Sequence, residues 1–391
     1  MTYIVDGART AFTEFGGSFS KIKADDLGAV TAKEALKRSQ VRPELIDQVI
    51  YGNVIHSHTN AAYLARHIGL KADIPVEVPA LTLNRLCGSG AQSVVSAVQS
   101  ILLGEADVVL AGGAENMSMA PFSNFNQRFG GNKYGALSFE DMLLSTLTDE
   151  YAGSGMGLTA EKLADMYNIS REEQDEFSLL SQTRAAKARE SGRFRKEIVP
   201  VEVKTRKETI EITEDEHIRD GLTMDQLGKL KPSFKKDGTV TAGNSSGIND
   251  GAASVVVASE KAVNDHQLKP IAKVLSWGIA GVDPTIMGIG PVPAIKQALK
   301  RADLTLDEID LIEVNEAFAA QYIAVEKELG LDREKTNVNG GAVALGHPVG
   351  VSGTRLLLSL AYELKERGLQ YGIASLCIGG GQGIAVVIES V

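Results

Sequence analysis

The chain repeats itself at a constant spacing, and this repeat limits the folds that it can adopt. The segments GSG at 88–90 and VSG at 351–353 each open a stretch of helical periodicity, at an offset of 353 − 90 = 263 residues. The segment ELIDQVI at 44–50 matches DEIDLIE at 307–313 at the same offset. Two matches at one offset favour duplication over chance, so we expect two similar halves.

A third match has a different offset. The strand and glycine turn VVLAGG at 108–113 resembles ASLCIGGG at 374–381, with 379 − 112 = 267, which we interpret as an insertion of about four residues. Residues 118–241 have no counterpart in the second half and combine aromatic, methionine and charged residues. We therefore predict an inserted domain at 118–241, an N-terminal half at 1–117 and 242–265, and a C-terminal half at 266–391.

Short apolar runs rich in β-branched residues alternate with segments of helical period. The runs at 3–5, 48–51 and 108–111 are of this kind, and such alternation predicts an α/β fold. After Cys87, apolar residues recur at helical spacing until Gly104, and these are Val94, Val95, Val98, Ile101 and Leu102. Cys87 is therefore expected at the amino terminus of a helix.

The composition excludes several classes of protein. A chain of 391 residues, 43% of them hydrophobic, can bury a large core. The net charge of −10 argues against nucleic acid as a general partner, since phosphate binding requires a positive surface. No apolar run is long enough for a membrane span. Two cysteines without a CxxC spacing argue against a disulfide framework and against zinc, so we predict a cytoplasmic protein.

Cys87 in NRLCGSG stands on a glycine-rich turn before the predicted helix. The helix dipole and free amides at that position favour a thiolate and any oxyanion formed beside it. An unperturbed thiol is mostly protonated at neutral pH, so this nucleophile needs a base. His347 in GGAVALGHPVGVSG is flanked by glycine and proline, an awkward position for core packing, and histidine is the usual base for a nucleophilic cysteine.

The second cysteine, Cys377 in CIGGGQG, ends an apolar strand and is followed by glycines that allow backbone amides to approach a ligand. Considered alone, it is better interpreted as a buried free thiol. The repeat brings its loop opposite the Cys87 loop, which favours a functional role. Oxidation could join two such thiols, and a regulatory disulfide between them is a further hypothesis.

The motifs NRLCGSG, NEAFAAQ, GGAVALGHPVGVSG and CIGGGQG resemble the signatures of the thiolase family in order and spacing, across nearly the whole chain. The resemblance implies an α/β thiolase fold, in which duplicated βαβαβαββ halves form a five-layered α-β-α-β-α arrangement and an inserted loop domain covers the active site. It also implies a homodimer or homotetramer that uses acyl-CoA substrates. Coenzyme A is then a substrate or product, with no other cofactor and no metal.

The same resemblance implies a ping-pong reaction that condenses acyl-CoA with acetyl-CoA to 3-oxoacyl-CoA and free CoA. His347 would activate Cys87, which takes the acyl group, and Cys377 would remove the α-proton of acetyl-CoA. His347 and a water held by Asn315 would bind the thioester oxygen. The amides of Cys87 and Gly379 would bind the oxyanion of the tetrahedral intermediate. From its position alone, Asn315 in EVNEAFA would be a helix cap.

The resemblance also implies a CoA-binding tunnel. Ser246 lies in GNSSGINDG, which alone would be an ordinary turn, and Arg219 matches the family's nucleotide contact. The remaining tunnel residues are Met156, Ala242, Met287 and Phe318. A cluster of lysines either serves the CoA phosphates or forms a solvated face, and its members are Lys229, Lys231, Lys235 and Lys236. His56 and His58 have a spacing suited to a metal but lack a third ligand nearby.

Two departures from the family bear on the substrate. Gly155 in SGMGLT stands where biosynthetic acetoacetyl-CoA thiolases carry a histidine, and HTNAAYLARHIGL at 58–70 differs from their GQNPAR pattern. We predict an acetoacetyl-CoA thiolase (acetyl-CoA C-acetyltransferase) that accepts somewhat longer chains. The alternative is a broad-chain 3-ketoacyl-CoA thiolase of fatty-acid β-oxidation.

Two other classes of protein compete with this interpretation. Ketoacyl synthases and hydroxymethylglutaryl-CoA synthases resemble the chain in architecture, but they carry His or Glu at the position of Cys377. An inactive acyl-CoA-binding subunit of a larger complex would be expected to lack at least one catalytic residue. All four are present, namely Cys87, Asn315, His347 and Cys377.

Overall fold

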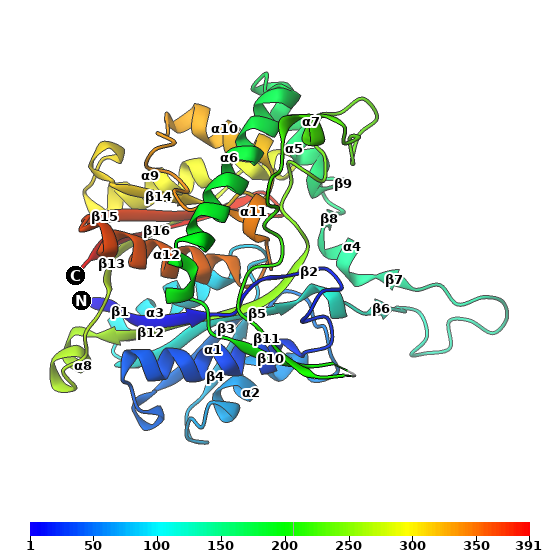
Figure 1. The fold of residues 1–391 in the computed structure, drawn as a ribbon. Coiled ribbons are helices and arrows are strands. Elements are labelled where there is room, and N and C mark those ends of the chain that lie inside the picture. The colour runs from blue at the N-terminus through cyan, green and yellow to red at the C-terminus, as the bar shows by residue number, and fades with distance from the viewer. Residues whose placement is uncertain (206) are drawn as a thin grey trace.

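The computed structural model describes residues 1–205 and 207–391. Its N-terminal half follows the predicted order βαβαβαββ, with the last strand supplied after a long insertion (Figure 1). The elements are β1 (Thr2–Arg9), α1 (Ala24–Ser39), β3 (Gln48–Gly52), α2 (Leu64–Lys71), β4 (Ala80–Leu83), α3 (Ser89–Leu102), β5 (Val108–Asn116) and β12 (Asn249–Ser259). The short β2 (Thr13–Glu14) pairs with β12, and α8 (Glu260–Asp265) leads to the second half.

The C-terminal half repeats this order with one strand reduced. Its elements are β13 (Ala272–Gly281), α9 (Pro291–Ala302), β14 (Leu311–Val314), α10 (Ala319–Leu329), α11 (Ala342–Leu345), α12 (Ser352–Arg367), β15 (Tyr371–Ile378) and β16 (Gln382–Ser390). Where the N-terminal half has β4, a single parallel bridge joins Thr336 to Ile312 of β14. The duplication predicted from the sequence is therefore confirmed, with an incomplete third strand in the second half.

The two halves meet at their first strands. The sheet runs β14-β15-β16-β13-β1-β12-β5-β3-β4, so the strands of the second half appear in the reverse order of those of the first. Only two residue pairs join β1 to β13, Tyr3 with Lys273 and Ile4 with Ala272. The halves are thus related by an approximate two-fold axis through this short junction.

The helices form three layers around the two parts of the sheet. α3 and α12 lie in the middle, where they contact strands of both halves and share one apolar core with them. α1 and α2 cover the outer face of the first half, and α9 and α10 that of the second (Figure 1). The predicted five-layered arrangement is confirmed. Of the apolar residues expected on α3, Leu102 at the last turn is 62% exposed, whereas the others are buried.

The amino ends of α3 and α12 touch at the two glycines that first revealed the repeat. A Cβ atom on Gly353 would lie 2.2 Å from the amide nitrogen of Ala91, and one on Gly90 would lie 2.8 Å from that of Thr354. The Thr354 hydroxyl donates to the Gly90 carbonyl at 3.0 Å. Glycine is required at both positions because any side chain would separate the helices.

Equivalent hydrogen bonds in the two halves test the predicted insertion of about four residues. Asp47 Oδ2 accepts the Val108 amide at 2.9 Å, and Asp310 Oδ2 accepts the Tyr371 amide at 2.9 Å. β5 and β15 therefore begin at equivalent residues, 371 − 108 = 263, and the predicted insertion of about four residues is wrong. The alignment of VVLAGG with ASLCIGGG failed because the first glycines lie within β5, whereas residues 379–381 form the turn after β15.

The insertion lies between β5 and β12, and part of it projects as a long arm (Figure 1). Its elements are β6 (Phe122–Ser123), β7 (Glu140–Asp141), α4 (Met142–Thr146), β8 (Thr148–Asp149), β9 (Ser154–Gly155), α5 (Met156–Met166), α6 (Arg171–Glu190), β10 (Val201–Lys204), β11 (Thr209–Ile212) and α7 (Met224–Gly228). No helix of the described chain combines the length and apolarity that a membrane crossing requires.

A buried ionic network joins the insertion to both halves. Arg9 on β1 has no exposed surface and pairs with Asp215 at 2.7 Å and Glu197 at 2.9 Å, both from the insertion. Glu197 also accepts the hydroxyl of Ser359 on α12 at 2.8 Å. The second acceptor atom of Asp215 binds another nitrogen of the Arg9 guanidinium at 2.9 Å, so the pair is bidentate.

We predict that Arg9→Ala destabilises the protein strongly. The change removes the bidentate partner of the buried Asp215 and leaves Glu197 with only the longer pair to Arg193 at 3.6 Å, which costs about 3–5 kcal/mol of unfolding free energy. Denaturant-induced unfolding measures the effect. The control is Lys33→Ala, which removes an ion pair with Asp73 whose side chains are 54% and 77% exposed and should change little. Equal shifts for the two variants would contradict the prediction.

Candidate active site

Cys87 lies on the turn between β4 and α3, two residues before the helix begins. The preceding residue, Leu86, has a left-handed backbone with φ of 47°, which is uncommon for a residue with a large side chain. Its amide donates to Asn84 Oδ1 at 2.8 Å, and its carbonyl accepts the Ser89 hydroxyl at 2.7 Å. These local bonds hold the strained turn that presents the Cys87 thiol.

His347 precedes α12, and its imidazole is held by the first residue of that helix. Nδ1 lies 2.6 Å from the Ser352 hydroxyl, which also donates to the Pro348 carbonyl at 3.1 Å. Because that hydroxyl donates its one hydrogen to Pro348, we assign the His347 Nδ1–H as the donor to the Ser352 oxygen, which makes Nε2 an unprotonated acceptor that Asn315 Nδ2 faces at 3.4 Å. The His347 amide donates to Asn249 Oδ1 at 2.9 Å, which fixes the backbone.

Asn315 follows β14 and faces His347 from the C-terminal half. Its Nδ2 lies 3.4 Å from His347 Nε2. Asn315 does not cap a helix, since α10 begins only at Ala319 and its cap residue, Phe318, makes no side-chain cap bond. Within the described part of the chain, the buried Asn315 Oδ1 has no hydrogen-bond donor, so it is an acceptor available to a ligand.

Cys377 and Gly379 lie at the end of β15 and influence the charge of Cys87. Cys377 is fully buried among apolar side chains that include Met287 and Ala317. The backbone amides of Gly379 and of Cys87 itself favour the thiolate of Cys87 and lower its pKa. A Cβ on Gly379 would lie 3.3 Å from Met156 Sδ, so the absence of a side chain allows this close approach. Both cysteines are free thiols.

The charges of the site favour neutral groups at rest. Burial raises the pKa of Cys87, the two nearby amides lower it, and the negative charge of Glu115 raises it further. Burial, together with the charge of an ionised Cys87, raises the pKa of Cys377 above its ordinary range. Burial and then the positive charge of Arg355 lower the pKa of His347 to about 3. A protonated thiol beside a neutral imidazole therefore describes the resting site.

Cys87 and His347 open into one cavity of about 640 Å³. All six residues predicted for CoA binding line it, and these are Met156, Arg219, Ala242, Ser246, Met287 and Phe318. Asn315, Cys377 and Gly379 do not line this cavity. The loop GNSSGINDG contacts the Asn315 segment directly, because the Ser246 amide donates to the Ala317 carbonyl at 3.0 Å.

Several lining residues carried no signal in the sequence. Leu144, Leu147 and Thr148 come from the insertion, and Phe15 comes from the segment after β1. Only the folded chain brings these four residues together at the wall of the cavity. Ser352 is different, because it is the repeat equivalent of Ser89, 352 − 89 = 263, and both serines begin central helices. The repeat could therefore have drawn attention to it.

The other charged candidates lie outside the site. Lys229 and Lys235 are engaged by exposed carboxylates, those of Asp225 at 2.5 Å and Asp165 at 3.0 Å. His56 is exposed, whereas the His58 side chain is only 5% exposed and faces Asp25 at 3.5 Å. Among the residues that the structure describes, no three side chains are arranged to hold a metal.

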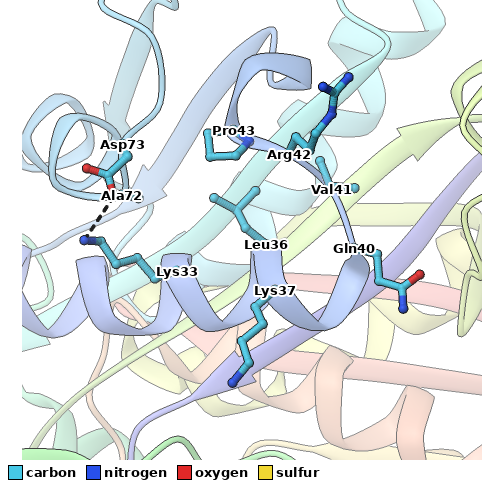
Figure 2. Close-up of a pocket in the computed structure, with 9 residues that line it drawn as sticks. All are labelled: Lys33, Leu36, Lys37, Gln40, Val41, Arg42, Pro43, Ala72 and Asp73. Atoms are coloured by element: carbon cyan, nitrogen blue, oxygen red, sulfur yellow. Dashed lines mark ion pairs between the residues drawn. The ribbon is translucent and has the colours of Figure 1, made fainter.

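A separate hollow of about 420 Å³ lies at the carboxy end of α1 and shares no residue with the catalytic cavity (Figure 2). Its basic side chains include Lys33, which is already paired with Asp73 at 3.2 Å. The carbonyl end of a helix disfavours an anion, so this hollow is not a second candidate for CoA phosphate.

Family models match the chain from end to end. The thiolase N-terminal domain matches residues 2–261, and the thiolase C-terminal domain matches residues 268–390. The chain belongs to the thiolase family. It is therefore an acyltransferase, and both its fold and its recognition as a thiolase from four sequence motifs are confirmed.

Relatives that carry one or the other of two enzyme names match nearly the whole length of this chain. Human mitochondrial 3-ketoacyl-CoA thiolase is 53% identical over 99% of this chain and 98% of its own. Acetyl-CoA acetyltransferase of Syntrophomonas wolfei is 50% identical over the same shares. The crystal structure of the human mitochondrial thiolase in complex with CoA superposes with a TM-score of 0.96 at 52% identity, covering 100% of this chain and 98% of that chain.

The prediction of a cytoplasmic protein is wrong by the same comparison. The human, mouse and rat 3-ketoacyl-CoA thiolases, each 53% identical to this chain, are mitochondrial proteins. The prediction rested on the low cysteine count. A count of this kind separates oxidising from reducing surroundings and does not distinguish one reducing compartment from another.

We predict that the alkylation rate of Cys87 does not level off near neutral pH. In a Cys377→Ala background, the rate of alkylation by iodoacetamide should rise about tenfold per pH unit from about pH 6 to about pH 8, because the thiolate fraction grows with pH. His347, with its lowered pKa, would not form a thiolate–imidazolium pair in this range. A rate independent of pH would reveal such a pair and contradict the prediction.

Proposed function

We propose that this thiolase reversibly cleaves 3-oxoacyl-CoA with CoA, acting on acetoacetyl-CoA and on somewhat longer chains. The observation that supports it best is the meeting of a nucleophile and a base in one cavity. Cys87 and His347 come from different halves of the chain and open into the same apolar space, with Cys377 buried beside them. The names of the relatives, 3-ketoacyl-CoA thiolase and acetyl-CoA acetyltransferase, also support this proposal.

In the first half-reaction, Cys87 attacks the 3-oxo carbon of the substrate. Its proton passes to His347 Nε2 as the sulfur–carbon bond forms, and the oxyanion is bound by the amides of Cys87 and Gly379. The C2–C3 bond then breaks, and the released carbanion takes the proton of Cys377 to become acetyl-CoA. The raised pKa of Cys377 suits a thiol that remains protonated until this step.

The charge on the departing acetyl-CoA needs its own donors. The thioester oxygen takes up negative charge as the bond to C3 breaks, and His347 is then protonated at Nε2 and can donate. Asn315 lies beside it with a buried acceptor oxygen. We propose that a water bound to Asn315 is the second donor.

In the second half-reaction, CoA attacks the acyl group on Cys87. The CoA thiol gives its proton to the Cys377 thiolate as the new thioester bond forms. The same two amides bind the second tetrahedral oxyanion. Cys87 leaves as a thiolate and recovers its proton from His347, so the enzyme returns to its starting state. Condensation follows the same steps in reverse.

The CoA chain would occupy the rest of the cavity. Met156, Met287 and Phe318 would line the pantetheine arm, beside Ala242 and Ser246, and Arg219 would face the nucleotide. We propose the division into halves at 1–117 with 242–265 and at 266–391. The loop domain at 118–241 then covers CoA, since it contributes residues to the cavity wall.

We also infer a homodimer or homotetramer. The projecting arm between β6 and β7 exposes aromatic side chains that a lone chain would leave in water. Phe125 is 66% exposed, Phe129 is 96% exposed and Tyr134 is 92% exposed. Analytical ultracentrifugation of the purified protein tests this inference, and a monomer at micromolar concentration would overturn it.

The test of function is thiolysis by the purified enzyme. We expect cleavage of acetoacetyl-CoA, 3-oxohexanoyl-CoA and 3-oxodecanoyl-CoA, and loss of detectable turnover in Cys87→Ala, because no other group can form the acyl-enzyme. Activity confined to acetoacetyl-CoA would exclude the longer chains. No activity on any of the three would overturn the proposed function.

Gly155 offers a sharper test of chain length. It lines the cavity, and a Cβ there would meet Leu147 O at 3.6 Å and Thr148 Oγ1 at 3.9 Å, which are ordinary contacts. Gly155→His should therefore fold and narrow the cavity. We expect kcat/KM for 3-oxodecanoyl-CoA to fall at least about tenfold relative to acetoacetyl-CoA. Gly153→His, at a glycine that does not line the cavity, is the control for the added imidazole, although its positive φ makes some loss of stability expected. If Gly155→His left the ratio of kcat/KM for 3-oxodecanoyl-CoA to that for acetoacetyl-CoA unchanged, position 155 would not limit chain length.

A further inference from the structure

Glu115, near the end of β5, is a buried carboxylate that no step above uses. It has no exposed surface, and its two oxygens accept four N–H groups. Oε1 accepts Asn53 Nδ2 at 3.0 Å and the Ile55 amide at 3.1 Å. Oε2 accepts the Val54 amide at 2.9 Å and the Gly350 amide at 3.1 Å. The donors belong to the turn after β3 in one half and to the His347 loop in the other.

This pattern of donors requires a charged carboxylate. Burial raises the pKa of Glu115, but four N–H donors occupy the lone pairs of both oxygens and leave no place for a proton. A neutral acid would turn one O–H toward an N–H group. The site therefore holds a fixed negative charge, balanced by amide dipoles rather than by a basic side chain.

The His347 loop is held at both of its ends by buried carboxylates. Gly350, three residues after His347, binds Glu115 of the N-terminal half. Val343, four residues before it, donates its amide to Glu316 of the C-terminal half at 3.1 Å. The backbone of His347 between them has little freedom, so the position of Nε2 depends on both anchors.

We propose that Glu115 is a positioning residue for the thiolase reaction, which anchors the His347 loop of one half to the turn after β3 of the other. The inference rests on the proposed function. The anchor keeps the base at the distance from Cys87 that proton transfer needs, and misplacement of about 1 Å is enough to cost about 100-fold in rate. The charge of Glu115 also opposes ionisation of Cys87 before substrate arrives.

Glu115→Gln is the first variant, because it keeps the size and removes the charge. Its NH₂ group would face two of the four N–H donors, and at the Oε2 position it would break the Gly350 bond that holds the His347 loop. We expect kcat for thiolysis of acetoacetyl-CoA to fall about 10- to 100-fold, with KM within about threefold of the wild type. Alkylation of Cys87, in the Cys377→Ala background, should become about three- to tenfold faster at neutral pH, because the opposing charge is gone.

Two further variants distinguish the effect of the Glu115 charge from a general loss of folding stability. Glu115→Asp keeps the charge on a shorter side chain, so kcat should fall while the pH profile of alkylation stays that of the wild type. Glu363→Gln alters another buried carboxylate on α12, which binds Arg193 at 2.6 Å and Asn339 at 2.7 Å, and neither of these partners lines the cavity. It should lower the unfolding temperature and leave the alkylation profile unchanged.

The proposal is overturned if Glu115→Gln keeps wild-type kcat, or if Glu363→Gln accelerates alkylation equally. If Glu115→Gln does not fold, Glu115→Asp decides, since wild-type kcat in that variant would also overturn it. Failure of the proposed function is a different outcome. It would be seen in the wild-type enzyme, which would cleave none of the substrates, while the alkylation comparison would still be measurable.

Discussion

The contact between the amino ends of α3 and α12 is the constraint on which the active site depends. Gly90 and Gly353 allow the two helices to touch at their first turns. The Cys87 turn leads directly into α3, and the His347 loop leads directly into α12. The distance between the Cys87 thiol and the His347 imidazole, the proposed nucleophile and base, is therefore set by the packing of two helices within one core, and not by flexible loops. Both helix dipoles also direct their positive ends toward the reacting groups.

The same packing explains why the site is neutral at rest. Cys87, Cys377 and His347 are enclosed by apolar side chains of the two halves, so a separated pair of charges would lose much of its solvation. The amides of Gly379 and Cys87 are the groups that favour negative charge on the Cys87 sulfur. The protein thus places its dipoles where charge develops during reaction, which is the arrangement that lowers barriers most.

The sequence was informative where the chemistry depends on single residue types. Cys87, His347 and Cys377 stand in glycine-rich motifs, and the repeat predicted both the two halves and the central helices. The offset of the last match was misjudged because glycines inside β5 resemble glycines in the turn after β15. Residues such as Glu115 and Leu144 gave no signal, since their partners lie far away in the chain and only tertiary structure brings them together.

The approximate two-fold axis creates a second position with the geometry of the active site. At an offset of 263, Gly350 corresponds to Cys87 and Asn84 to His347, while Ala114 corresponds to Cys377. None of these side chains can act as nucleophile or base. The amino end of α12 nevertheless keeps its amides, and the one on Gly350 is bound permanently by Glu115. A symmetric ancestor of two identical chains would have had two equivalent sites. In this chain the proposed catalytic residues occupy one position, and at the other the Glu115 carboxylate accepts the Gly350 amide.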